Sequence, residues 1–118
     1  MNQVSEFVEY LKEVFEQFGS VQARRMFGGY GIYHDGIMFG LVADDTLYLK
    51  ADEVTAAHFV SRSLDQFEYD KGSKVVKMSY YLAPDEIFDD PEEAALWGRR
   101  ALEAASRAKP KVRKKGKR

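Results

Sequence analysis

Apolar residues recur at spacings of three and four along the first eighteen residues of the chain. They form a continuous apolar stripe on one side of an α-helix, with acidic residues between them. We expect Asn2 to cap the start of this helix and Gly19 to close its end. The stripe consists of Val4, Phe7, Val8, Leu11, Val14, Phe15 and Phe18. The segment therefore predicts an amphipathic helix that packs on the rest of the protein.

Between residues 30 and 50 the pattern changes to short runs rich in aromatic and branched side chains. Turn-forming residues separate the runs, at 34–36 and 43–45. The expected strands are Tyr30 to Tyr33, Ile37 to Val42 and Thr46 to Lys50. Their short connections predict an antiparallel meander of three strands.

Alternation along these strands predicts which side chains face the core. Ile37, Phe39 and Leu41 are expected on one face of their strand, as are Leu47 and Leu49 on the next. The opposite face needs an explanation, because it carries large side chains instead of small polar ones. These are Tyr33, Met38 and Tyr48.

The second half of the chain predicts a short helix and a hairpin. Asp52 is the expected N-cap of a helix that ends near Val60, with Val54, Ala57 and Phe59 as its apolar contacts. Strands at 67–69 and 74–82 then flank a four-residue loop. In the longer strand, one face carries Val76, Met78 and Tyr80, and the wetter face carries Val75, Lys77, Ser79 and Tyr81.

The last predicted element is a helix that begins at Asp90-Pro91-Glu92-Glu93. This sequence supplies a side-chain cap, a proline in the first turn and two acids at the positive end of the helix dipole. A single turn is expected just before it, at residues 84–88. A narrow seam along the helix is expected to pack on the sheet, formed by Ala94, Trp97, Ala101, Ala104 and Ala105.

The order of elements is helix, three-stranded antiparallel meander, helix, two-stranded hairpin and C-terminal helix. It predicts an α+β fold with one antiparallel sheet packed on helices. The expected domain spans residues 1–107, and a basic flexible tail is expected at residues 108–118.

Several motifs resemble the N-terminal domain of TfoX, also called Sxy, a family of bacterial competence regulators. They are FGGYGIY followed by DG, MFGLV, DDTLYLK, MSYY at residues 78–81, and the closing Asp-Pro-Glu-Glu helix with Trp97. The similarity runs from about Met1 to Arg107. It implies an α+β fold similar to secretion chaperones and a role as a transcriptional coactivator. It also implies a partner protein, a cyclic-AMP-responsive activator. Two-domain relatives continue into a small helical domain where this sequence has only its basic tail.

Charge is distributed unevenly along the chain. Residues 107–118 hold eight lysines and arginines and no acid, whereas residues 1–106 hold ten basic and nineteen acidic side chains, a net charge of −9. An acidic body repels a phosphate backbone, so any contact with nucleic acid is expected from the tail, from a local cluster of basic residues or through a partner. The nucleic-acid candidates are Arg107, Lys109, Lys111, Arg113, Lys114, Lys115, Lys117 and Arg118. The alternatives are a solubilising terminus or an arm that folds onto an acidic body.

The candidates for protein contact lie around the glycine-rich bend and on the strands. Gly28 and Gly29 lack the following Lys-Ser/Thr and helix of a phosphate-binding loop. We interpret them as a kink where the chain passes close to another backbone. Arg24 and Arg25 beside this bend are candidates for an anion or acidic partner. Tyrosines that combine contact area with a polar group complete the set: Tyr30, Tyr80 and Tyr81.

The sequence offers little for catalysis, metals or cofactors. It contains no cysteine, which excludes disulfides and thiol chemistry. His34 and His58 lie in a hairpin turn and a short helix, and no serine has the context of a nucleophile. The aspartates at turns and caps lack the spacing of a calcium loop. No catalytic, metal or cofactor site is therefore predicted.

The sequence also lacks the features of secretion and of a membrane span. Its N-terminal stripe is interrupted by acidic residues, and no apolar run approaches the ~20 residues that cross a bilayer. A cytoplasmic location is expected.

These observations favour a non-enzymatic regulatory or adaptor domain that acts through protein contacts and DNA contacts. One alternative is a dimeric, chaperone-like scaffold that holds a partner segment. Another is a small-ligand binding protein or an enzyme, which would need a deep pocket lined by Arg25, His34 or His58.

Overall fold

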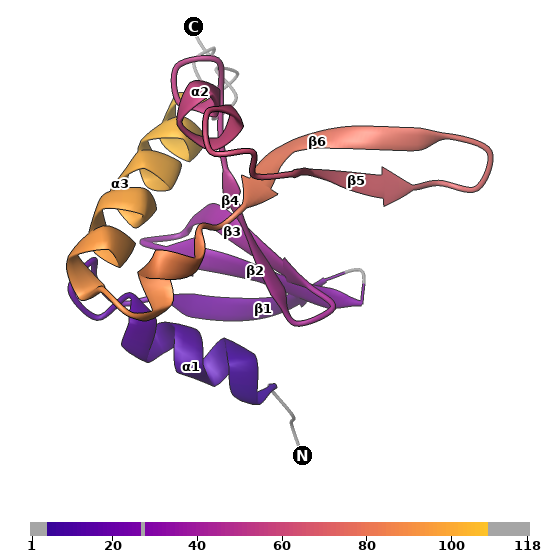
Figure 1. The fold of residues 1–118 in the computed structure, drawn as a ribbon. Helices are drawn as coiled ribbons and strands as arrows, with labels where there is room; N and C mark the ends of the chain where they lie inside the picture. The colour runs from indigo at the N-terminus through magenta and orange to yellow at the C-terminus, as the bar shows by residue number, and fades with distance from the viewer. Residues whose placement is uncertain (1–4, 27, 109–118) are drawn as a thin grey trace, which may run out of the picture.

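A computed structural model describes residues 5–26 and 28–108. One antiparallel sheet of six strands, in the order β1-β2-β3-β4-β6-β5, packs against helices on one of its faces (Figure 1). The elements are α1 (Glu6–Val14), β1 (Gln22–Met26), β2 (Gly29–His34), β3 (Ile37–Ala43), β4 (Thr46–Lys50), α2 (Ala56–Val60), β5 (Gln66–Asp70), β6 (Val75–Leu82), the 3-10 helix η1 (Asp85–Phe88) and α3 (Pro91–Arg107). The expected α+β fold with one sheet packed on helices is confirmed.

The first helix is shorter than expected at both ends. Ser5 is its N-cap, because the Ser5 hydroxyl accepts a hydrogen bond from the Val8 amide at 3.1 Å. The expected cap, Asn2, lies outside the described residues. The helix ends at Val14, and Phe15 to Phe18 form turns instead of a last helical turn. Both Val14 and Phe15 are nevertheless buried, so the predicted apolar stripe does face the core.

The meander has one strand more than the sequence predicted. Residues 22–26 form β1, an edge strand that pairs antiparallel with β2, where the sequence indicated a connecting segment. An edge strand with solvent on one side needs few apolar residues. In β1 only Ala23 and Met26 are partly buried, so the segment lacks the pattern of a central strand.

A β-bulge in β3 corrects the predicted faces of that strand. Ile32 pairs with Gly40 but Tyr33 pairs with Met38, so Phe39 has no partner of its own. Phe39 lies in the core, yet the extra residue sends Leu41 to the opposite face, beside Tyr48 of β4. The prediction that Phe39 and Leu41 share a face was therefore wrong.

Aromatic rings fill the space between the sheet and the helices. The Phe15 ring meets the Phe39 ring edge-on, with centroids 5.5 Å apart. On α3, every residue of the predicted alanine and tryptophan seam is buried. Gly98 lets α3 approach closely, because a Cβ there would lie 2.9 Å from Cδ1 of Phe18. The predicted cap of α3 is also confirmed, since Asp90 accepts hydrogen bonds from the first-turn amides.

The second helix starts later than expected and buries less. Asp52 accepts hydrogen bonds from the amides of Val54 and Thr55, but these residues form a turn, and α2 begins only at Ala56. Of the three expected apolar contacts, only Phe59 is buried, whereas Val54 is 65% exposed.

An ion pair joins the end of α3 to the turn that precedes α2. Arg107, in the last turn of α3, donates to both carboxylate oxygens of Asp52, at 2.6 and 3.2 Å. The bidentate geometry lowers the pKa of Asp52 from its ordinary 3.8 to about 2, and the hydrogen bonds from Thr55 and Val54 add to this effect.

This ion pair predicts a specific pH dependence of stability. Asp52→Asn keeps the hydrogen-bond acceptor but removes the charge, and we expect it to lower the Tm by about 2–4 °C at neutral pH. Because the pKa of Asp52 is lowered by folding, the wild-type advantage is present above about pH 4. It declines below pH 4 and is lost as the pH falls through about 2, the pKa of Asp52 in the folded protein. Thermal unfolding of both chains across this range measures it, and an advantage that is as large near pH 2 as at neutral pH would contradict the assignment.

Candidate functional site

The β5–β6 hairpin projects from the body of the protein (Figure 1). Within the described residues, the end of β6 joins it to the rest of the sheet: Tyr80, Tyr81 and Leu82 lie opposite Lys50, Leu49 and Tyr48 of β4. The Ser79 carbonyl also accepts a hydrogen bond from the Ala51 amide at 2.9 Å. In that part of the chain, β6 before Ser79 pairs with β5 alone. We call residues 66–79 the arm.

The two faces of the arm differ in chemistry. Tyr69 lies opposite Val76, and the pair shares the face that also carries Met78. Glu68 lies opposite Lys77 on the other face, so that side is charged. The predicted alternation of β6 is confirmed along the arm, where residues 75, 77 and 79 are exposed and residues 76 and 78 are partly buried.

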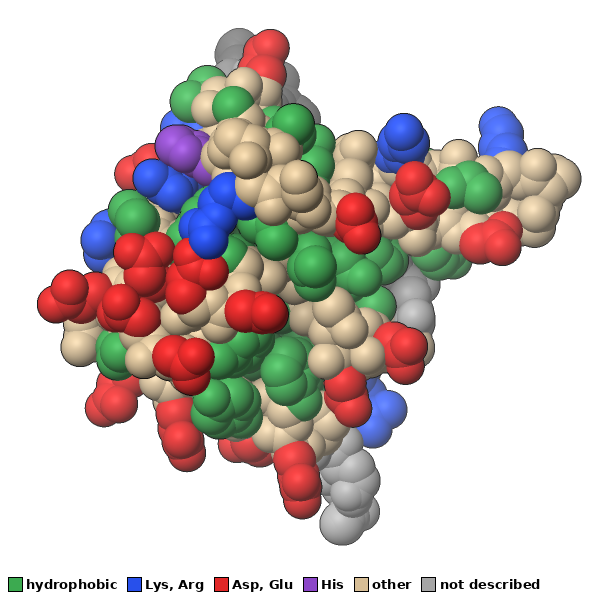
Figure 2. All heavy atoms as spheres, in the orientation of Figure 1, with side chains coloured by type: hydrophobic (Ala, Val, Ile, Leu, Met, Phe, Trp, Pro, Cys, Tyr) green, Lys and Arg blue, Asp and Glu red, His purple; other side chains and the backbone are tan. Residues whose placement is uncertain are grey.

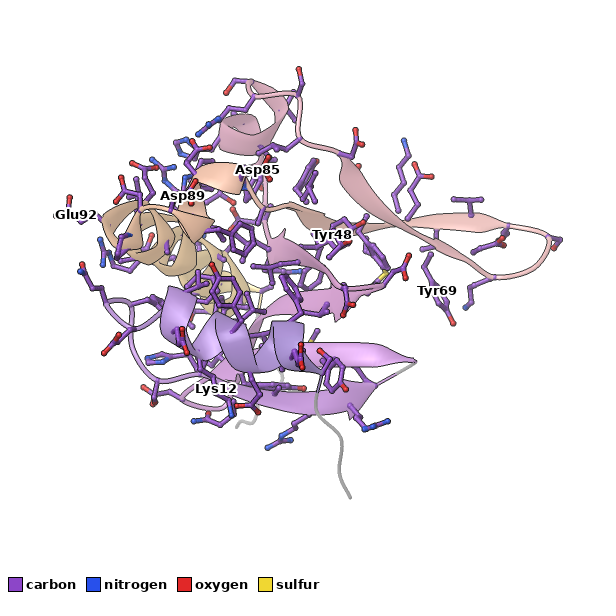
Figure 3. All side chains as sticks on the ribbon, turned by 60° about the horizontal axis from the view of Figure 1, so that its bottom comes forward. Lys12, Tyr48, Tyr69, Asp85, Asp89 and Glu92 are labelled. Carbon is purple, nitrogen blue, oxygen red and sulfur yellow. The ribbon has the colours of Figure 1, made fainter. Side chains whose placement is uncertain are left out.

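An apolar groove of about 890 Å³ lies between the arm and the face of the sheet that the helices leave uncovered. Figure 2 shows apolar side chains gathered between the arm and the body. In Figure 3, Tyr69 projects from the arm and Tyr48 lies beneath its beginning. The sheet contributes Met26, Gly28, Gly29, Tyr30, Met38, Leu41, Val42, Ala43 and Asp44, and the arm and the rest of β6 contribute Phe67, Tyr69, Lys71, Val76, Met78 and Tyr80.

The groove explains one of the three large side chains expected on the second face of the sheet, because Met38 lines it and Tyr33 and Tyr48 do not. Leu41, displaced by the bulge, and Met38 form part of its floor. The sulfur atoms of Met26 and Met38 crowd Gly31, where an added Cβ would lie 2.9 and 3.1 Å from them. Methionine side chains adapt to irregular surfaces, so this floor suits a protein segment.

The two tyrosines at the base of the arm lie on opposite faces of the sheet. Tyr80 is in the groove and 9% exposed, and the Lys50 ammonium lies 5.2 Å from the centre of its ring. Burial raises the pKa of Tyr80 and lowers that of Lys50. Tyr81 stacks on Phe59 at 5.2 Å on the helix side, so its placement on the wetter face was wrong.

The glycine-rich bend lies at one end of the groove. A Cβ at Gly29 would lie 2.1 Å from the backbone oxygen of Val42, which confirms that the chain passes close to another backbone there. Gly28 has φ +81°, a conformation that other residues rarely adopt. The contact role of both glycines stays a prediction.

The two arginines ahead of the bend lie on the free edge of the sheet. Consecutive strand residues point to opposite faces, and the guanidinium of Arg24 lies 4.9 Å from the Tyr33 ring centre. Arg25 lies 5.8 Å from that of Tyr30. Both arginines are exposed, so the edge presents two cations on an acidic body. We call this pair the arginine edge.

The structure separates the other sequence candidates from the groove. The Ser20 carbonyl accepts a hydrogen bond from Nδ1 of His34 at 2.7 Å, and His58 meets Trp97 edge-on. Arg107, a nucleic-acid candidate, is paired with Asp52. The other seven candidates of the tail lie outside the described residues.

The sequence did not point to most of the groove lining. Met26, Met38, Leu41, Phe67 and Met78 were not candidates for contact, because each fits core packing equally well. The one usable signal for the lining was Met38, a large residue expected on the outward face of its strand.

The comparison with protein families agrees with this arrangement. The sequence profile described as the TfoX N-terminal domain matches residues 13–105. The chain belongs to this family. In this chain, the groove and the arginine edge lie outside the core between the sheet and the helices.

Two curated relatives give the family its biological context. The chain is 26% identical over 98 residues to Protein Sxy of Escherichia coli (strain K12), which covers 83% of this chain and 47% of the relative. It is 30% identical over 78 residues to DNA transformation protein TfoX1 of Aliivibrio fischeri (strain ATCC 700601 / ES114), which covers 63% and 37%. The aligned region spans less than half the length of either relative.

Two further properties concern metals and membranes. Across residues 5–26 and 28–108, no three His, Asp or Glu side chains come together in a way that could hold a metal ion. The helices in that same part of the chain are too short or too polar to cross a bilayer.

Because the backbones of β2 and β3 approach closely at Gly29, we expect that adding a single methyl group there lowers the stability of the fold. Gly29→Ala should destabilise the protein by about 1–3 kcal/mol, because the new Cβ must displace the backbone of β3. Ser73→Ala in the exposed loop of the arm is the control, with an expected change within about 0.5 kcal/mol. Urea unfolding measures both values, and equal stabilities would show that the backbones do not pack as described.

Proposed function

We propose that this chain is a non-enzymatic regulatory adaptor domain that acts through protein contacts on the uncovered face and free edge of its sheet. The observation that carries the proposal is the apolar groove, in a domain whose family includes proteins named for DNA transformation. Large exposed apolar surfaces in soluble domains are typical of sites for protein partners.

The lining of the groove supports binding over catalysis. Most of its side chains are apolar, and its charged members are Asp44 and Lys71. Acid–base and nucleophilic catalysis need ionisable groups that converge on a reacting atom. Neither histidine lines the groove, which favours a surface that binds over one that reacts.

The arginine edge supports a regulatory protein as the partner. Resemblance to competence regulators implies that the partner is a cyclic-AMP-responsive activator. We propose that this activator contacts the arginine edge. Arg24 and Arg25 are cations on a body with a net charge of −9 over residues 1–106, so they would favour an acidic surface on the partner. Among the described residues β1 is an edge strand of the sheet, and edge strands are positions to which a partner can add a strand.

Charge reversal tests the partner contact. In a binding assay with a purified cyclic-AMP-responsive activator, Arg24→Glu with Arg25→Glu should weaken binding at least about tenfold, because two attractive contacts become repulsive. The control reverses two other exposed cations, Lys12→Glu with Arg99→Glu, and should change affinity less than about twofold. No binding by the wild type, or equal losses in both variants, would contradict the proposal.

We also propose that the basic tail contacts DNA, and its amino-acid sequence supports this proposal. Eight lysines and arginines in twelve residues would add affinity that is independent of DNA sequence. A chain that ends at Arg107 should lose most DNA binding, and binding by the intact chain should fall steeply between about 50 and 200 mM salt. Electrophoretic mobility shifts measure both effects, and equal binding by the two chains would refute the tail hypothesis.

A further inference from the structure

The arm exposes apolar surface that its own chain does not cover. An isolated two-stranded hairpin is marginally stable in water, and among the described residues no third strand pairs with residues 67–78 of the arm. Tyr69 is 41% exposed on the groove side of the arm, and Val75 is 60% exposed on its other side. The groove below is likewise open. A partner that buries the apolar face of the arm and the groove would remove from solvent the largest apolar surface described above.

Charges of opposite sign mark the two lips of the groove. The loop at the tip of the arm carries Lys71 and Lys74, and the β3–β4 turn carries Asp44 and Asp45. Both aspartates have positive φ, at 56° and 54°, in the tight turn that projects from the body. Within the described part of the chain, none of these four side chains has a salt-bridge partner.

We propose that the groove binds the arm of a second copy of this chain, in a two-fold symmetric dimer. Each arm lays its Tyr69, Val76 and Met78 face into the groove of the other copy. The lysines at its tip then meet Asp44 and Asp45 of that copy. The inference rests on the proposed function only in treating the groove as a protein-binding surface.

Self-complementarity favours a second copy over a foreign segment. The apolar face of the arm, which forms one wall of the groove, and the apolar floor of the sheet occur on the same chain, together with a cationic tip and an anionic turn. An isologous interface requires such self-complementary surfaces. The arm cannot fill its own groove, because the pairing of Tyr80 to Leu82 with β4 fixes it as one wall. A two-fold axis forms each contact twice, so the apolar burial is also doubled.

This dimer leaves the arginine edge available. Arg24 and Arg25 lie on β1, at the opposite edge of the sheet from β5. Dimerisation through the arms and regulatory contact through the edge are therefore separable. The first can be measured on the purified chain alone, and the second needs the partner protein.

The mass of the full-length chain in solution provides the first test. Light scattering after size exclusion, at about 1 to 100 µM, should give a dimer that dissociates at the low end of this range or below. Asp44→Lys with Asp45→Lys should raise the dissociation constant at least about tenfold, as should Lys71→Glu with Lys74→Glu, because each brings like charges together. Glu13→Lys on α1 with Glu16→Lys in the turn that follows it is the matched control, and this variant should dimerise normally.

Mixing the two weakened variants gives the decisive result. In a mixed dimer, the lysine tip of the first variant meets the aspartate turn of the second, and the glutamate tip of the second meets the lysine turn of the first. Both contacts are then attractive, so the mixture should form heterodimers that neither variant forms with itself. A fluorescent label on one variant identifies them.

Two outcomes would overturn the proposal. A wild-type chain that is monomeric throughout the range has no such dimer. A dimer that both charge reversals leave intact uses another surface. Either result is independent of activator binding, because we propose that activator binding depends on Arg24 and Arg25 and not on the arm. Loss of activator binding with the dimer intact would refute the proposed function alone.

Discussion

The pairing of three residues of β6 with three residues of β4 determines the functional surface of this domain. Tyr80, Tyr81 and Leu82 continue the sheet, while the preceding part of the same strand leaves it. Alternation sends Tyr81 to the helix side, where it stacks on Phe59, and Tyr80 to the uncovered side. Because the strand is anchored only at this end, the arm stands over the sheet and encloses the groove.

The two faces of the sheet therefore have different roles: one packs the core, and the other forms the floor of the groove. The helix side is packed in the way that specifies a single fold, with phenylalanines from α1 and β3 and an alanine seam on α3. The other side carries methionines and tyrosines, which make an adaptable apolar surface with polar groups at its margin. Acidic side chains crowd the region of η1 and the start of α3 (Figure 2), away from the arm. The surface is thus divided into an acidic side and an apolar groove.

The sequence predicted those parts of the fold in which local chemistry and burial agree. The stripe of α1, the strand that became β4 and the cap and seam of α3 all follow this rule. It failed at β1, whose edge position needs little apolar surface, and at Leu41, because alternation does not reveal a bulge. The start of α2 was misplaced because Asp52 caps a turn before the helix. The groove could not be predicted from the sequence, because its position depends on where β6 leaves the sheet. The large residues expected on the outward face, Tyr33, Met38 and Tyr48, indicated only that this face is not an ordinary polar surface.

Backbone hydrogen exchange on the dilute chain tests most directly whether the arm is attached only through the end of β6. Stability is distributed unevenly in proteins, and segments with few buried contacts open first. The account predicts that amides of β5 and of residues 75–78 exchange well before those of β3, β4 and residues 80–82. Exchange of the arm together with the central strands, as one cooperative unit, would contradict it.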